Sequence, residues 1–473
     1  MTEVQSCKRC RIEKAVVVSR KEPFCSECFC KFVSLKQRKQ MMSDQYFQDI
    51  FKVMYQDKVK TAEIAEKMNA ESRVLVPLSF GSSSLVMLNV LNDVLEEQLE
   101  VHRGKTGFSI EILVCYFGAA QEKSLKDRLR ALMNTRLLKT KKLYKIHVVD
   151  IETFFNSSKH IQVHLEDTSY IVRKINTFSN DTGSQPTVDV LLNRCVNRSA
   201  REDLLNVMRT AVIKQFAVQG QYKAILWGHS MTRLADEIMA SVVKGRAAQI
   251  ASALDNESFD VEFDESFKNL HPMRDVLLSE IDAFCHISNL LPYIYEYYPQ
   301  QTLLIEKNSE SGHSPSPKMV RNMTINELAR QYFDNIEGNY SNVISTVVRT
   351  GAKLDRPLNT VPTASRCGIC YTMLYRNGPE WLRHITVTSS YPLVTEEDHH
   401  LYSTWINSEH GKSREHYLEL ASEFKVNGKE LATCYGCLLI LGEVKDKNIS
   451  WPESKPDILK DVIEDFVIDD DEE

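Results

Sequence analysis

Eight of the chain's twelve cysteines lie in Cys-x-x-Cys pairs, and this pattern constrains the fold more than any other feature of the sequence. Each pair supplies two thiolates, and four thiolates form the tetrahedron that a structural zinc ion prefers. In a long chain without a signal peptide, such pairs indicate metal binding rather than disulfides. We therefore expect two structural zinc ions and no iron–sulfur cluster, held by Cys7, Cys10, Cys25, Cys28, Cys367, Cys370, Cys434 and Cys437.

The two N-terminal pairs are separated by fourteen residues, which is the spacing of a zinc ribbon or a treble-clef knuckle. A unit this small has too little apolar material to fold unaided, so the metal would supply its folding free energy. The alternatives are a redox dithiol pair or unpaired surface thiols. Cys30 is a further thiol nearby, but the repeated spacing favours Cys28 as the ligand.

The two C-terminal pairs are 63 residues apart, which is long for one metal knuckle. We expect a second zinc site that carries an inserted excursion at residues 372–430. The alternative is that these cysteines are buried core residues that never meet. The remaining thiols Cys115, Cys195 and Cys285 stand singly in apolar or helical contexts, and we interpret them as core residues.

The net charge of −6 conceals an uneven distribution of charge. Residues 1–60 carry thirteen Lys or Arg against seven Asp or Glu, whereas residues 461–473 carry eight acidic residues and no basic one. Such a division suggests a polyanionic partner. The apolar runs are shorter than the about 20 residues that span a bilayer. Because the N-terminus also lacks the apolar core of a secretory signal, we expect a soluble, cytoplasmic protein with no membrane partner.

Apolar β-type runs alternate with helical patterns between the cysteine units. This alternation predicts an α/β fold with a doubly wound parallel sheet, in which ligands bind at the carboxyl ends of the strands. Strand patterns occur at 73–79, 108–117, 144–150 and 222–227, and helical patterns at 85–99, 121–139, 202–219, 233–245, 265–300 and 324–354. Residues 176–187 are polar and irregular, and residues 306–318 have the composition of a Ser/Pro linker or loop.

These features together divide the chain into six expected segments. They are an N-terminal zinc ribbon with a basic segment (1–40), a helical connector (41–70), an α/β domain (71–300), a linker with a helix (301–360), a C-terminal zinc unit (361–445) and an acidic, disordered tail (446–473).

The loop at residues 79–84 follows the first strand of the α/β domain and reads Ser-Phe-Gly-Ser-Ser-Ser. A strand, a loop with glycine and hydroxyls, and a helix N-terminus together form a potential anion site. The loop lacks the Gly-Lys-Ser/Thr end of a Walker loop. A serine-rich N-cap on a strand–helix turn is therefore an equally good interpretation.

The order of these motifs resembles the cytoplasmic tRNA 2-thiolation protein 2 family. Two cysteine pairs and a basic helix come first, then the Ser-rich loop, then a Trp-Gly-His-Ser loop after a later strand, and finally the terminal cysteine pairs. The similar stretches cover nearly the whole chain and are specific in combination: residues 24–29, 31–42, 82–90, 227–232, 241–245, 322–327 and 434–438.

This resemblance implies a fold of the pyrophosphatase-loop, adenine nucleotide alpha hydrolase-like type. It also implies a heterodimer with a paralogous catalytic tRNA thiolase, which adenylates the wobble uridine and replaces its 2-oxygen with sulfur. The products are 5-methoxycarbonylmethyl-2-thiouridines in lysine, glutamine and glutamate tRNAs. The sulfur comes from a thiocarboxylated ubiquitin-related modifier, which is a further possible partner.

The chain departs from the catalytic pattern of that resemblance at two places. The enzymes' phosphate loop reads Ser-Gly-Gly-x-Asp-Ser, but here Phe80 replaces a glycine and Ser83 replaces the acidic residue. The enzymes' central cysteine pair is reduced to Cys195. We therefore expect no catalytic residue, and ATP binding stays doubtful. We expect a degenerate nucleotide loop comprising Ser79, Gly81, Ser82, Ser84 and His229. We interpret His229 as a residue that shapes its loop.

The basic segment supplies the candidate tRNA-binding residues Lys31, Lys36, Arg38 and Lys39. Phosphate neutralisation by such residues dominates nucleic-acid affinity, although a run of this kind is often only a solvated helix face. Two alternatives to a non-catalytic thiolation subunit stay open: an active ATP-dependent tRNA sulfurtransferase or adenylyltransferase, and a zinc-based interaction scaffold without a role in RNA.

Overall fold

The computed structural model describes most of the chain. The described residues are 5–156, 160–166, 171–175, 187–263, 265–307, 322–354, 366–375, 378, 395–426 and 430–453. Most of the predicted Ser/Pro loop at 306–318 and of the predicted tail at 446–473 lies outside these ranges.

The chain forms two compact units, and each combines two separate stretches of sequence. The first unit contains Met1–Thr153 and Met208–Arg356, and the second contains Phe154–Val207 and Pro357–Glu473. Residues 154–207 therefore belong with the C-terminal stretch, a grouping that the sequence analysis did not predict. None of the helices that the structure describes combines the length and the apolar composition of a membrane span.

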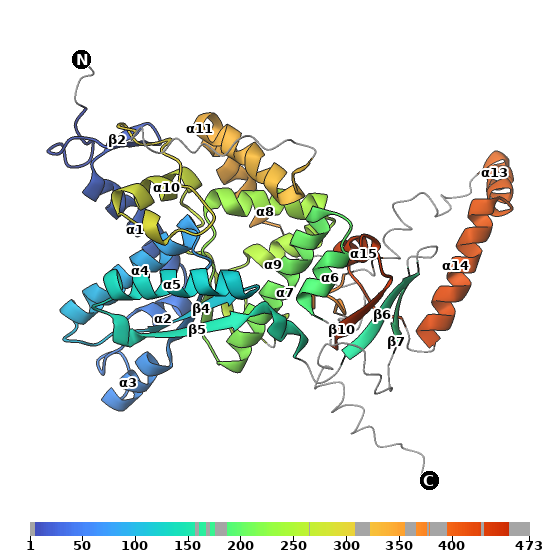
Figure 1. Ribbon diagram of the computed structural model, residues 1–473, viewed down its shortest axis with the longest axis horizontal. Helices are drawn as coiled ribbons and strands as arrows, with labels where there is room; N and C mark the ends of the chain where they lie inside the picture. The colour runs from blue at the N-terminus through green and yellow to red at the C-terminus, as the bar shows by residue number, and fades with distance from the viewer. Residues whose placement is uncertain are drawn as a thin grey trace, which may run out of the picture. The chain divides into compact units, whose positions relative to one another are not determined.

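A parallel sheet with strand order β5-β4-β3-β8-β9 forms the centre of the first unit (Figure 1). Its strands are β3 (Arg73–Pro77), β4 (Ser109–Tyr116), β5 (Tyr144–Asp150), β8 (Ala224–Leu226) and β9 (Lys268–Leu270). Every neighbouring pair is parallel, and the order reverses between β3 and β8. The predicted parallel α/β sheet is confirmed, and its switch point lies beside the end of β3.

Alternate residues of β3 pack into cores on opposite faces of the sheet, because successive side chains of a strand point to opposite sides. Val74 and Val76 share a core with α4 (Ser82–Val101) and α5 (Ala119–Thr135). Leu75 packs with residues of α7 (Arg198–Gln219). Helices therefore cover both faces, as a doubly wound sheet requires.

The N-terminal segment and the later helices complete the first unit. Its hairpin and first helix share the main core, through residues that include Phe24, Phe29 and Val33. Helix α11 packs along α8 in a separate apolar core. These elements are β1 (Val17–Ser19), β2 (Glu22–Phe24), α1 (Ser26–Met41), α2 (Gln45–Phe51), α3 (Ala62–Glu71), α8 (Met231–Val243), α9 (Ile250–Leu254), α10 (Leu278–Ile287) and α11 (Ile325–Gly351).

The expectation of a helix over 265–300 is wrong for most of that range. Strand β9 occupies its beginning, and only α10 and a short turn at Leu291–Tyr293 are helical. The strand has no apolar run because Lys268 and Asn269 are polar, yet both are buried. The ammonium of Lys268 lies 4.6 Å from the ring centroid of Tyr46, and Asn269 donates a hydrogen bond to Asp260 (2.7 Å).

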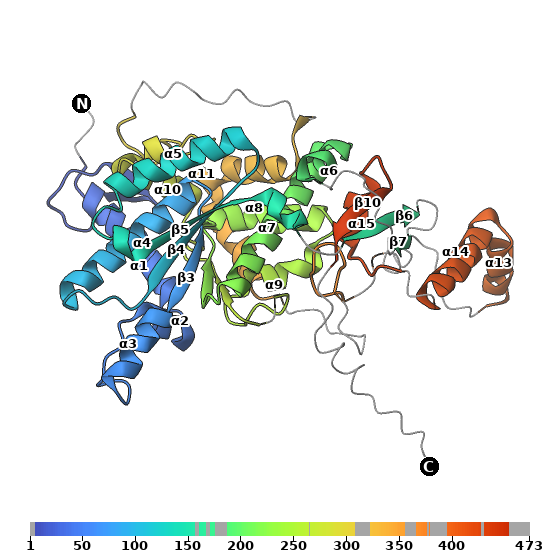
Figure 2. The ribbon, with the colours of Figure 1, turned by 60° about the horizontal axis from the view of Figure 1, so that its bottom comes forward.

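The second unit is built around an antiparallel sheet with strand order β10-β6-β7 (Figure 2). Strand β10 pairs with β6 although the two are almost 290 residues apart in sequence, as the pair Asn448 and His164 shows. The unit's elements are β6 (His160–Glu166), β7 (Ile171–Ile175), α6 (Val188–Arg194), α13 (Glu396–Ile406), α14 (Glu409–Val426), α15 (Tyr435–Gly442) and β10 (Asn448–Pro452). The expected excursion at 372–430 thus contains two adjacent helices.

Candidate functional site

The four N-terminal cysteines converge on one point. The sulfur atoms of Cys7, Cys10, Cys25 and Cys28 all lie within 4.8 Å of one another. The first pair forms a tight turn, in which the N–H of Arg11 donates to the carbonyl of Cys7 (2.9 Å) and Arg11 adopts a φ of 59°. The second pair stands where α1 begins, with Cys25 as its N-cap.

The C-terminal cysteines repeat this arrangement in the second unit. The sulfurs of Cys367, Cys370, Cys434 and Cys437 also lie within 4.8 Å of one another. Here the N–H of Tyr371 donates to the carbonyl of Cys367 (3.0 Å), and Tyr371 has a φ of 63°. Cys434 is the N-cap of α15. The interpretation that these cysteines never meet is wrong, because their sulfurs lie together although the two pairs are far apart in the sequence.

The spacing of the sulfurs suits a single ion. Four sulfurs at about 2.3 Å from a tetrahedral zinc ion stand about 3.8 Å apart. The sulfurs of Cys10 and Cys25 are 3.9 Å apart, and those of Cys370 and Cys434 are 3.7 Å apart. Each group could therefore hold one metal ion.

The charge state of the thiols also requires a cation if all four are to ionise. Burial and the neighbouring thiols raise the pKa of Cys28 to about 12. The neighbouring thiols and burial raise the pKa of Cys437 well above its usual value. Burial also acts on Cys7, but N–H donors, including that of Cys10, outweigh it and lower the pKa of Cys7 to about 6. Four adjacent thiolates would repel one another, and a bound divalent ion offsets that repulsion.

The serine-rich loop and the Trp-Gly-His-Ser loop meet at the switch point of the sheet. A Cβ added to Gly228 would lie 2.8 Å from the Cα of Ser84, so the two backbones are in direct contact. The hydroxyls of Ser79 and Ser84 are 3.2 Å apart, and Ser84 donates to the carbonyl of Gly81 (2.9 Å). The predicted loop residues are thus brought together, but their hydroxyls bond to one another.

The side chain of Phe80 closes this loop. It is fully buried and adopts a φ of 58°, in the left-handed region that a bulky residue seldom enters. The N–H of Tyr295 donates to its carbonyl (2.9 Å). Ser82 and Ser84 at the start of α4 are also buried. A phosphate that approached the helix N-terminus would therefore meet packed side chains rather than open backbone N–H groups.

A buried carboxyl group beside the loop has no counterpart in the sequence analysis. Burial raises the pKa of Asp282 to about 7, although N–H and O–H groups donate to it from Gln300 (2.9 Å) and Tyr297 (2.7 Å), and Ser82 also donates. Asp282 lies 200 residues after Ser82, so no local pattern indicated it. Asp282 thus accepts a hydrogen bond from Ser82, so a third hydroxyl of the loop is bonded within the protein.

The imidazole ring of His229 stacks against two neighbouring rings. Its ring centroid lies 6.1 Å from that of Trp227 and 5.8 Å from that of His271, and its Nε2 is 3.5 Å from a carboxylate oxygen of Glu237. Burial lowers the pKa of His271 well below its usual value, so that ring is neutral. These contacts are consistent with the interpretation that His229 shapes its loop.

The four predicted tRNA-binding residues lie on α1 in different settings. Lys36 is mostly buried and forms an ion pair with Glu280 (3.0 Å). Arg38 forms a two-pronged ion pair with Glu97 (2.5 and 3.0 Å). Lys31 pairs with Glu27 one turn away, and both side chains are largely exposed.

Lys39, the fourth residue, is exposed. The exposed candidates on this helix are therefore Lys31 and Lys39. Lys36 instead donates to the buried carboxylate of Glu280, which lies 244 residues away in the sequence.

The single cysteines lie outside both four-cysteine groups. Cys195 and Cys285 are buried, and Cys115 is half-buried. Cys195 donates to the carbonyl of Leu191 (3.8 Å). Among the described residues, Cys195 does not belong to any group of three or more side chains that could hold a metal ion.

The fold and these sites define a class: a doubly wound α/β protein that carries two four-cysteine groups and a Ser-rich loop at its switch point. Relatives support a more specific assignment. The chain is 46% identical over 449 residues to cytoplasmic tRNA 2-thiolation protein 2 of Kluyveromyces lactis, covering 94% of each chain. It is 44% identical to the protein of the same name in Vanderwaltozyma polyspora, covering 100% of this chain and 99% of the relative. Residues 324–439 match the model of the same family. The chain belongs to the cytoplasmic tRNA 2-thiolation protein 2 family.

A solved structure also resembles the chain. It is the U34-tRNA thiolase NcsA from Methanococcus maripaludis with its [4Fe-4S] cluster. The likeness has a TM-score of 0.46 at 14% sequence identity, and covers 74% of this chain and 87% of that one.

Proposed function

We propose that this chain is a non-catalytic subunit of a heterodimeric complex that 2-thiolates the wobble uridine of lysine, glutamine and glutamate tRNAs in the cytoplasm. The full-length similarity to relatives named for tRNA 2-thiolation is the observation that carries this proposal. In it, the partner is a paralogous thiolase with an intact phosphate loop, and the sulfur comes from a thiocarboxylated ubiquitin-related modifier. This chain binds the partner and the tRNA, and its domain descends from the pyrophosphatase-loop type.

The state of the loop supports a non-catalytic role. Phe80 fills the position of a glycine, and the hydroxyls of Ser79, Ser82 and Ser84 bond within the protein. Catalytic groups have to be held within a fraction of an ångström of productive geometry. A loop closed by its own side chains does not offer that geometry to ATP.

We further propose that both four-cysteine groups bind zinc. The sulfur separations of 3.7 and 3.9 Å support a single ion at each group. An iron–sulfur cluster places iron and sulfide between the cysteines, and would therefore hold their sulfurs farther apart. The ions would be structural, because all four positions of each tetrahedron are filled by the protein.

Changing Ser79, Ser82 and Ser84 together to Ala is expected to leave most tRNA thiolation intact. The reason is that these hydroxyls stabilise a closed loop rather than a nucleotide. Deletion of the whole chain should abolish 2-thiouridine in the three tRNAs. The measurement is the thiolated fraction of tRNA, read by its retardation in a mercury-containing gel.

A triple variant that is folded and bound to its partner but supports no thiolation would contradict the non-catalytic role. ATP–pyrophosphate exchange by the purified chain without its partner would favour the active-enzyme alternative. A complex that thiolates tRNA but binds it no more tightly than the partner alone would favour the scaffold alternative.

The exposed lysines of α1 provide a test of tRNA binding. Lys31→Glu with Lys39→Glu should weaken tRNA binding by the complex, and the loss should decrease as salt is raised, because each phosphate contact releases counterions. Lys36 is left unchanged because its loss would remove one of the two cations that pair with the buried carboxylate of Glu280. Binding curves over a salt series, compared with those of Lys58→Glu with Lys60→Glu, measure the effect. Equal affinity for the two variants would exclude this face of α1 from the RNA surface.

A further inference from the structure

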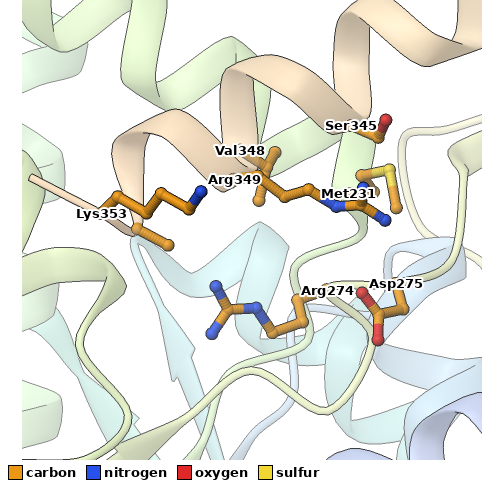
Figure 3. Close-up of a pocket in the computed structure, with 8 residues that line it drawn as sticks. Met231, Arg274, Asp275, Ser345, Val348, Arg349 and Lys353 are labelled. Atoms are coloured by element: carbon orange, nitrogen blue, oxygen red, sulfur yellow. The ribbon is translucent and has the colours of Figure 1, made fainter.

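A pocket of about 240 Å³ lies in the first unit, between the last turns of α11 and the loop that follows β9 (Figure 3). It is lined by Met231, Arg274, Asp275, Ser345, Val348, Arg349, Ala352 and Lys353. Neither the serine-rich loop nor His229 contributes to this lining. The pocket is therefore a different place from the degenerate nucleotide loop.

The pocket lies at the carboxyl edge of the parallel sheet. Met231 begins α8 directly after β8, and its N–H donates to the carbonyl of Val276 (2.8 Å) in the loop after β9. Open α/β sheets take their ligands at this edge. On α11, the spacing of Ser345, Val348 and Arg349 places them on one helical face over the same space.

The lining of the pocket is strongly cationic. Arg274, Arg349 and Lys353 face it against a single carboxylate, that of Asp275 (Figure 3). Within the described ranges, none of the three cations forms a close ion pair with a carboxylate, and Arg274 donates to the amide oxygen of Asn256 (2.7 Å). The carboxylate of Asp275 already accepts a hydrogen bond from Gln40 (2.6 Å).

The helix macrodipole explains only part of this arrangement. Cations at the C-terminus of a helix are favourable, and Arg349 and Lys353 occupy that position on α11. Arg274 comes from a loop, and burial lowers the pKa of its guanidinium although the carboxylates of Asp275 and Glu257 act to raise it. A half-buried cation that costs free energy to desolvate, and that faces two more cations, indicates an anionic ligand.

We infer that this pocket binds a phosphate group of the tRNA backbone. The inference rests on the proposed function, because it assumes that the chain handles tRNA. The volume is below the about 300–1,000 Å³ of sites that enclose a small molecule, which favours one phosphate of a larger ligand over a whole nucleotide. Arg349 and Lys353 are exposed, so the ligand can continue across the surface beyond the pocket.

The test uses the full-length chain in complex with its partner and fluorescently labelled tRNA. Arg349→Glu with Lys353→Glu is expected to weaken binding on the order of tenfold and to lower the slope of log affinity against log salt by about 1.4–1.8. Both residues are exposed, so the variant should fold. Lys58→Glu with Lys60→Glu makes the same change in net charge at exposed residues outside the pocket, and should bind like the wild type.

Arg274→Gln provides a second variant, in which a shorter, uncharged polar side chain removes one cation. It should lower the salt slope by about 0.7–0.9. Direct titration of the wild-type chain and of the double variant with ATP separates the two sources of phosphate. We expect ATP affinity to be unaffected by the double variant.

Each other outcome overturns the inference in a distinguishable way. Wild-type affinity and slope in both pocket variants would exclude the pocket while leaving the proposed function intact. A wild-type complex in which this chain adds nothing to tRNA binding would reject the proposed RNA role together with the pocket. Loss of ATP binding with unchanged tRNA binding would assign the pocket to a free nucleotide.

Discussion

Replacing Cys434 with Ser is expected to remove one of two zinc ions from the chain and to unfold the C-terminal cysteine region. Cys434 stands within 4.8 Å of three other thiols, so its replacement removes a metal ligand, whereas the serine hydroxyl can still cap α15. The metal joins residues more than sixty positions apart, and apparent binding free energies of structural zinc are about 10–16 kcal/mol. Elemental analysis should show about one zinc per chain, and limited proteolysis should cut near residues 366–375.

Cys195→Ser is the matched control for this experiment. Cys195 is a buried thiol of the same unit but lies outside the four-cysteine group. We expect it to retain two zinc ions and the wild-type proteolysis pattern. Two zinc ions in the Cys434→Ser protein, or iron with a visible absorption band in the wild type, would contradict the proposed metal sites.

Cys25→Ser should also lose one zinc ion, but with a smaller structural effect. The sequence suggested that the N-terminal unit has too little core to fold without metal. In the structure, Phe24, Phe29 and Val33 pack into the main core of the first unit. We therefore expect α1 to stay in place, while the knuckle around Cys7 becomes susceptible to protease.

Replacing Glu280 with Gln is expected to destabilise the first unit by about 3–5 kcal/mol, because removal of one partner leaves buried charge unpaired. The side chain of Glu280 is fully buried. Its carboxylate accepts hydrogen bonds from Ser19 (2.8 Å), Arg20 (2.8 Å) and Lys36 (3.0 Å). It also accepts from the N–H of Leu277 at the start of α10. One carboxylate thus ties the hairpin, α1 and α10 together.

The stabilisation of the folded state by the Glu280 carboxylate should depend on pH in a defined direction. Burial acts to raise the pKa of Glu280, but the charges of Lys36 and Arg20 outweigh it and hold that pKa below the usual value. The stabilisation is therefore present above the unfolded-state pKa of about 4.3 and is lost as pH falls through the folded-state pKa. The difference in stability between wild type and Glu280→Gln should shrink below about pH 4.3.

Urea unfolding at several pH values measures this difference. Glu97→Gln is the control, because Glu97 pairs with Arg38 on the same helix α1 but is 59% exposed. An exposed pair contributes about 0–1 kcal/mol. A loss of similar size in the two variants would contradict the role of Glu280.

Local sequence patterns predicted the centre of the fold well. The strands β3, β4 and β8 are mostly apolar runs, and such runs report burial directly, whereas β5 mixes polar and apolar residues and only its Tyr144 is buried. The cysteine spacing likewise predicted both four-cysteine groups. Strands β6 and β7 were missed although His160–Glu166 alternates polar and apolar residues, because β6 lies between β7 and β10, and β10 stands almost 290 residues later in the sequence.

The roles of charged residues were less predictable from sequence. Lys36 and Lys39 have the same chemistry and stand in the same run, yet one is buried against Glu280 and the other is exposed. Only the tertiary fold brings Glu280 to that helix. The pocket was missed for the same reason. Arg274 and Arg349 both line it, but they are far apart in the sequence and no local pattern links them.

The composition of the second unit from two distant stretches has a consequence for biosynthesis. A ribosome completes β6 long before it reaches β10, since the paired residues His164 and Asn448 are 284 positions apart. At about 5–20 residues per second, that interval lasts roughly 15–60 s. During this time one edge of β6 has no strand to pair with, and an unpaired edge promotes association between chains. A nascent chain that stalls or ends before residue 448 would therefore leave an exposed strand edge for chaperones to shield.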